Sequence, residues 1–99
     1  MTNLEILKGM RQILDKRESW HKGWYSANEK GQQCYLTSAC RFCLVGAYMK
    51  ASGRYWVDQE ISELFDKKIG PMPAWNDAKE RTHADVIQLL DEMIAEQNA

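Results

Sequence analysis

The stretch that decides the fold is CRFCLVGAYMKA, residues 40–51. Its only charged side chains are Arg41 and Lys50, one near each end, and the residues between them are apolar or small. A helix that is apolar on every side has no face that suits water, and such helices are buried. We therefore expect a buried central helix over residues 39–52.

Amphipathic helices are predicted on both sides of this segment. Thr2 and Glu5 have the spacing of a capping box, and so have Thr82 and Asp85; each pair precedes apolar residues at helical intervals. A third periodic run follows Asp58 and stops where Gly70 and Pro71 cannot continue a helix. The predicted helices cover about residues 3–18, 59–69 and 83–97.

A different pattern separates the first helix from the central one. Aromatic and polar residues alternate on either side of NEKG, in which Asn28 and Gly31 favour a turn. We expect a small β-hairpin over about residues 23–36, and an irregular loop is the alternative because few of these residues are β-branched. The predicted fold is α+β and mostly α, with about four helices in one compact domain over residues 1–99.

Composition indicates a cytoplasmic protein. No apolar run approaches the roughly 18 residues that cross a bilayer, and the N-terminus lacks the pattern of a signal peptide. Three cysteines, an odd number, fit a reducing compartment better than a disulfide framework. The net charge is −1, but residues 1–50 carry eight Lys or Arg against four acids, and residues 51–99 carry five against ten. An acidic second half could bind a basic protein partner.

The Cys40-x-x-Cys43 pair raises a thiol or metal hypothesis. A redox pair begins a helix, where the helix N-terminus lowers a thiol pKa, but here the second cysteine is expected one turn inside a buried helix. A zinc site would need Cys34 as well, with His21 or His83 as fourth ligand, and the spacing matches no zinc finger. We predict no catalytic residue, metal or cofactor.

Two sets of residues are candidates for binding. Tryptophan is enriched where proteins bind one another, and the segment WND places one beside an amide and a carboxylate. The alternative is that this polar pair only fixes a turn. Basic side chains in the first half would instead contact phosphate in a nucleic acid. The predicted partner-binding residues are Trp20, Trp24, Trp75, Asn76 and Asp77, and the nucleic-acid set is Arg11, Lys16, Arg17 and Lys22.

Four segments of the chain together resemble a family of small domains of unknown function found in bacteria and bacteriophages. The segments are GWYSANEKG, ACRFCLVGAYMKA, WND and RTHADVIQLLDEMIA. The likeness covers about residues 5–95. It implies structural roles for a small-residue helix face and for the start of the last helix, and it implies a phage or mobile-element setting. The matching residues are Trp24, Gly31, Cys43, Gly46, Ala47, Asn76, Asp77, Thr82 and Val86, and the structural set is Cys43, Gly46, Ala47, Thr82 and Asp85.

These observations lead to three functional hypotheses. The first is a noncatalytic protein-interaction domain of phage or mobile-element type, for which inhibition of a host defence system is one role. The second is a small nucleic-acid-binding module that uses the basic and aromatic N-terminal half. The third is a thiol- or zinc-dependent protein.

Overall fold

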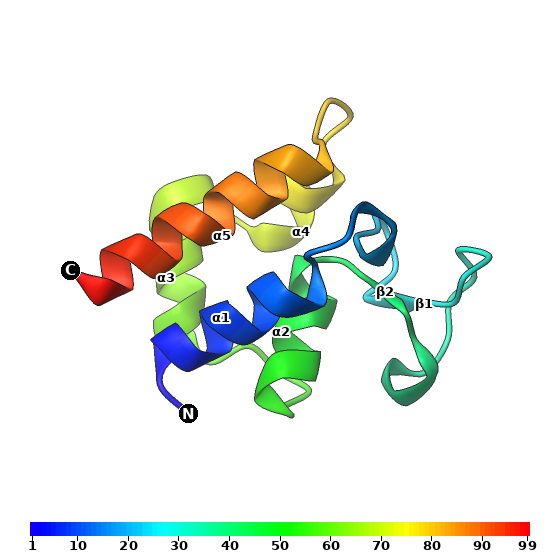
Figure 1. Ribbon diagram of the computed structural model, residues 1–99, viewed down its shortest axis with the longest axis horizontal. Helices are drawn as coiled ribbons and strands as arrows, with labels where there is room; N and C mark the ends of the chain where they lie inside the picture. The colour runs from blue at the N-terminus through cyan, green and yellow to red at the C-terminus, as the bar shows by residue number, and fades with distance from the viewer.

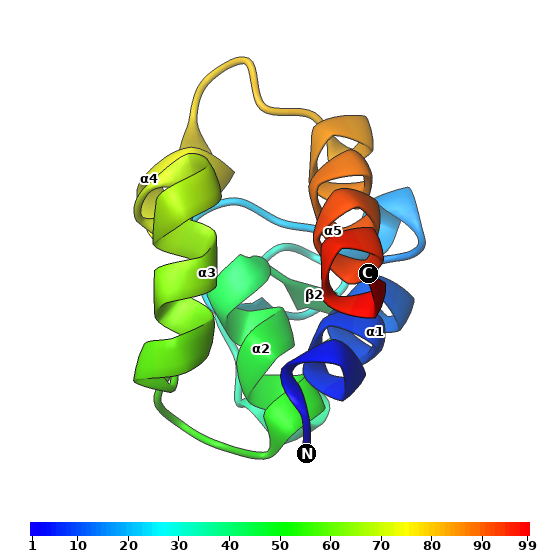
Figure 2. The same ribbon diagram turned by 90° about the vertical axis from the view of Figure 1, so that its left-hand side faces the viewer.

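The central helix of the fold is α2 (Leu44–Ser52), as the apolar stretch predicts. Residues 44–48 are all buried, and Figure 2 shows α2 in the middle, with α3 and α4 on one side and α1 and α5 on the other. The computed structural model describes residues 1–99. Its other helices are α1 (Asn3–Ile13), α3 (Gln59–Ile69), α4 (Met72–Asp77) and α5 (His83–Asn98), and its strands are β1 (Ser26–Ala27) and β2 (Arg41–Phe42).

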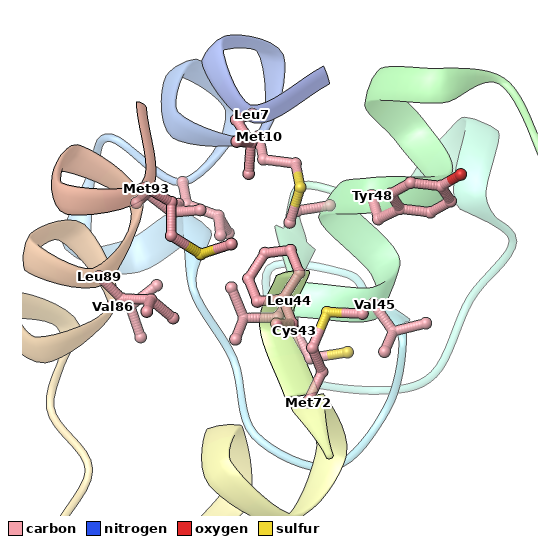
Figure 3. Packing of buried hydrophobic residues seen from close by; sticks show 14 of the residues in the cluster. Leu7, Met10, Cys43, Leu44, Val45, Tyr48, Met72, Val86, Leu89 and Met93 are labelled. Carbon is pink, nitrogen blue, oxygen red and sulfur yellow. The ribbon is translucent and has the colours of Figure 1, made fainter. Parts of the chain in front are cut away.

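The core forms where these helices meet. Leu7 and Met10 of α1, Leu44 and Tyr48 of α2, and Leu90 of α5 are all fully buried, and Figure 3 shows α1, α2, α4 and α5 contributing side chains to one cluster. Burial of apolar surface is the dominant favourable contribution to folding. The prediction of an α+β, mostly helical fold is confirmed.

Both capping boxes are confirmed. The Thr2 hydroxyl accepts from the Glu5 amide at 3.1 Å, and the Glu5 carboxylate accepts from the Thr2 amide at 3.0 Å. Thr82 and Asp85 exchange the same pair of bonds, at 3.2 and 3.0 Å. The helices after these caps therefore begin where the sequence predicts, because a cap depends only on residues within one turn.

The central helix is shorter than predicted: it begins at Leu44 rather than at residue 39. Cys43 is its N-cap, and its sulfur accepts a hydrogen bond from the Gly46 amide at 3.4 Å. The preceding residues, Arg41 and Phe42, are extended because they pair with β1 in an antiparallel ladder. Cys40, predicted to lie in the first turn of the helix, lies outside it.

The hairpin has a different second strand from the one predicted. Asn28 and Gly31 do form the turn, and an isolated antiparallel bridge joins Ala27 to Gln33. The ladder partner of β1, however, is β2, which pairs with the other edge of Ala27. Segment 26–27 therefore lies between two neighbours, and Figure 1 shows it at one end of the molecule, beside the helices.

Two further differences concern the helix ends. α1 stops at Ile13 instead of residue 18, and a 3₁₀ turn follows at Arg17–Ser19. The segment containing WND forms the short helix α4 and not only a turn; its prolines stand at the start of the helix, where proline costs no hydrogen bond. No helix is long and apolar enough to cross a membrane.

Candidate functional site

Asn76 of α4 joins three parts of the chain. Its Oδ1 accepts from the Trp20 indole N–H at 2.8 Å and from the Leu44 backbone amide at 3.1 Å. Its Nδ2 donates to the His21 carbonyl at 3.1 Å and to Asp77 Oδ1 at 2.9 Å. The side chain is 1% exposed and both of its polar atoms are satisfied. We call these five residues the Asn76 network.

The Asn76 network also fixes the chain just before the exposed aromatic residues. Asp77 Oδ1 accepts from the Gly23 amide at 3.0 Å. The Lys22 ammonium donates to the carbonyl groups of Ala78 and Lys79, at 2.7 and 3.2 Å, where α4 ends. Cations are favourable at a helix C-terminus because free carbonyl groups gather there. Residues 20–23 are thus tied to α4 by contacts from both backbone and side chains.

His21, within this network, has an unusual environment. Its backbone amide donates to the Phe42 carbonyl at 3.0 Å, while Nε2 is buried and has no hydrogen-bond partner. Removal from water, with a smaller contribution from Arg41, lowers the pKa of His21 below its ordinary value of 6.5, and Asp77 opposes the shift. The folded protein therefore favours the neutral imidazole.

Trp24 and Tyr25 directly follow this fixed segment and lie at the surface. Their side chains are 49% and 51% exposed. The backbone of Tyr25 lies so close to α2 that a Cβ placed on Gly46 would be 1.7 Å from the Tyr25 carbonyl oxygen. Glycine is needed at position 46 for this close approach. The two aromatic side chains thus project from a backbone that is packed against the central helix.

Tyr35 lies at the same end of the structure. The Cys34 amide donates to the Ser26 carbonyl at 3.3 Å, and the Ser26 hydroxyl donates to the Cys34 carbonyl at 2.7 Å. Tyr25 precedes Ser26 and Tyr35 follows Cys34, so these bonds bring the two tyrosines to the same end of the paired segments. Tyr35 is 85% exposed and borders a cavity of about 460 Å³ that Gln33, Cys34 and Ser38 complete. We call Trp24, Tyr25 and Tyr35 the aromatic surface.

The predicted partner-binding residues do not form one exposed site. The Asn76 side chain is buried and fully hydrogen-bonded inside the protein, so it presents no free polar group to a partner. Trp20 is half-buried and bound to Asn76, and Trp75 is half-buried beneath the Arg81 guanidinium, 3.8 Å from its ring centre. Asp77 is exposed, but it accepts from Gly23 and Asn76. Of the five, Trp24 alone has a large, free aromatic surface.

The predicted partner-binding set left out four exposed aromatic residues. Five of the eight tryptophans and tyrosines are exposed, and Trp24 is the one that the partner-binding set included. The available signal was their position in polar segments without helical periodicity. Such segments lie at the surface of proteins. The four missed residues are Tyr25, Tyr35, Tyr55 and Trp56.

Of the four basic residues in the nucleic-acid hypothesis, two are bound within the protein and two are free. Arg11 pairs with Asp15 at 2.6 Å and with Asp91 at 2.8 Å, which raises its pKa. Lys22 is occupied by the two carbonyl groups at the end of α4. Lys16 and Arg17 are exposed and make no ion pair. Two of the four cations are thus available to phosphate.

The three cysteines are free and do not converge. Ala27 pairs on one edge with Gln33, the neighbour of Cys34, and on the other edge with Arg41, the neighbour of Cys40, so a strand lies between these two cysteines. A disulfide needs Cα atoms closer than about 7 Å. Cys43 is buried, as predicted, and burial raises the pKa of its thiol; Cys40 is exposed. No three His, Cys, Asp or Glu side chains are grouped closely enough to hold a metal ion.

Comparison with known proteins supplies a family. The family model described as "Family of unknown function (DUF6197)" matches residues 1–96. No curated protein matches, and no solved structure matches. The match covers nearly the whole chain, and it agrees with the predicted membership of a family of unknown function.

Proposed function

We propose that this chain, which belongs to the family of unknown function DUF6197, is a noncatalytic protein-interaction domain. Its contact site is the aromatic surface of Trp24, Tyr25 and Tyr35. The observation that carries the proposal is that three exposed aromatic side chains project from backbone segments that the helical body holds in place.

Rigid aromatic residues suit protein binding for two physical reasons. Tryptophan and tyrosine bury a large area on contact, and they lose little side-chain entropy because each has two rotatable side-chain bonds. The backbone on both sides is already ordered: Gly23 is bound by Asp77, and Cys34 is bound by Ser26. Binding therefore has little further conformational entropy to remove.

The surroundings of the aromatic surface indicate what kind of partner group fits. Tyr35 forms part of the wall of the cavity of about 460 Å³, whose other lining residues carry no formal charge. An apolar side chain of a partner would fill this cavity against Tyr35, while Trp24 and Tyr25 contact other parts of the partner. The partner is thus a folded protein with a protruding apolar residue, and recognition relies on shape and apolar area more than on charge.

The cellular setting is part of the same proposal. The likeness of the four sequence segments to domains of bacteria and bacteriophages supports a phage or mobile-element origin, and the odd number of cysteines supports the cytoplasm. Modulation of a host defence system is a role that fits a small noncatalytic binder in that setting.

Affinity capture with matched variants tests the proposal. Tagged wild-type protein is incubated with bacterial lysate beside Trp24→Ala/Tyr35→Ala and a control, Tyr55→Ala/Trp56→Ala, which removes two aromatic residues that are 76% and 63% exposed elsewhere. We expect one stoichiometric protein with the wild type and the control, and its loss with the first variant. Circular dichroism melts confirm that each variant is folded.

Two outcomes contradict the proposal. One is an empty capture with wild-type protein, and the other is equal capture by both double variants. The nucleic-acid hypothesis has a separate signature, because phosphate contacts release counterions: binding to short DNA or RNA that weakens with salt and with Lys16→Glu/Arg17→Glu would support it.

A further inference from the structure

A second cavity, separate from the aromatic surface, lies where the 3₁₀ turn after α1 meets the start of α5. It has a volume of about 550 Å³. Six residues line it, of which two are arginines and none is an acid: Arg17, Trp20, Arg81, Thr82, His83 and Ala84. Concentrated positive charge in a concave site attracts anions, because the surrounding protein focuses the electric field.

The two arginines differ in how firmly they are held. Arg81 Nε donates to the Trp75 carbonyl at 2.8 Å, its guanidinium stacks on the Trp75 ring, and Nη1 lies 3.9 Å from Asp85. Its second amino group, Nη2, has no partner within the protein. The Arg17 side chain is exposed and makes no hydrogen bond or ion pair. Two arginines therefore line the cavity, one held by the protein and one without a side-chain partner, and each keeps unpaired N–H donors.

The start of α5 and Trp20 form the other walls of the cavity, and they add hydrogen-bond donors and fixed side chains. The backbone amides of His83 and Ala84, the first two of α5, have no hydrogen-bond acceptor. His83 Nε2 lies 2.6 Å from the Leu14 carbonyl, and since a carbonyl only accepts, Nε2 donates and ties α5 to the end of α1. This bond fixes the position of His83, and Trp20 contributes an aromatic wall that the Asn76 network holds in place.

We infer that this cavity binds the phosphate group of a small phosphorylated molecule. Guanidinium groups match the geometry of phosphate oxygens, and several donors from different directions suit a tetrahedral, doubly charged group better than a planar carboxylate. The volume falls within the range of about 300–1,000 Å³ that is typical of small-ligand sites. A nucleoside monophosphate fits this chemistry, with its phosphate at the arginines and its base beside Trp20.

Two-dimensional amide NMR spectra test the inference. Inorganic phosphate, adenosine monophosphate and sodium chloride at matched ionic strength are titrated into wild-type protein, Arg17→Gln and Lys16→Gln. The last variant removes a neighbouring cation that does not line the cavity. We expect saturable shifts of the His83 and Ala84 amides with both phosphates, tighter binding of the nucleotide, and about tenfold weaker binding in Arg17→Gln only, the size expected for a hydrogen bond to a charged group.

Three results overturn the inference: equal shifts with chloride, shifts spread over the whole surface, or the same weakening in both variants. A titration with short single-stranded DNA completes the experiment. If the oligonucleotide binds here more tightly than the monophosphate and its affinity falls steeply with salt, the ligand is a nucleic acid instead. The spectrum of each variant shows whether it is folded.

Discussion

Replacing Asn76 by alanine removes a side chain that is 1% exposed and takes part in four hydrogen bonds. The alanine leaves the Leu44 amide, at the start of α2, and the Trp20 indole N–H without acceptors. A buried donor without a partner costs about 1–3 kcal/mol, so the two together should lower the free energy of unfolding by about 3 kcal/mol. For a domain of this size such a loss lowers the melting temperature by roughly 12–24 °C.

Urea unfolding followed by circular dichroism measures this loss. Asp77→Ala is the comparison: it removes one acceptor of the same network from an exposed position that water can reach, and we expect it to cost about 1 kcal/mol. If Asn76→Ala costs no more than Asp77→Ala, the Asn76 side chain does not hold the fold together and our reasoning fails.

Asn76→Asp separates the two halves of the network. The aspartate keeps an oxygen for Trp20 and Leu44 but places a second oxygen against the His21 carbonyl and the Asp77 carboxylate. Burial and the neighbouring Asp77 carboxylate both raise the pKa of such a group, so the variant should be strongly destabilised at neutral pH. The difference from wild type should shrink as the pH falls and the acid becomes protonated. A difference that does not change with pH would contradict this assignment of the two side-chain atoms.

Three further predictions concern other parts of the fold. Gly46→Ala should destabilise the protein by about 2 kcal/mol in urea unfolding, because the new methyl group collides with the Tyr25 backbone; a neutral effect would exclude that close approach. In a Cys34→Ser background, which removes the other accessible thiol, a thiol reagent should modify Cys40 much faster than Cys43 in the folded protein, and Cys40→Ser should remove the fast phase; equal rates would contradict the burial of Cys43. The pKa of His21 is lowered on folding, so its contribution to stability is complete above pH 6.5 and is lost as the pH falls through the folded pKa. The free energy of unfolding should therefore rise with pH over this range, and His21→Gln should abolish the rise.

The sequence by itself determined the features that depend on neighbouring residues. Residues within a turn or two of one another account for three features of the fold. These are the Thr2 and Thr82 caps, the end of α3 at Gly70 and the burial of the central helix. The periodicity of apolar residues also identified the faces that form the core, because a helix presents every third or fourth residue on one side. These local rules were sufficient for the fold class.

The tertiary structure alone decided where the chain pairs and which polar groups are buried. Ser26–Ala27 could pair with a segment after its own turn, and its ladder instead forms with Arg41–Phe42, which also moves the start of α2 to Leu44. Asn76 bonds to Trp20, 56 positions away, and that contact converts a predicted surface residue into the centre of a buried network. Strand partners and buried hydrogen bonds depend on residues far apart in the chain, and their choice is fixed only when the helices pack.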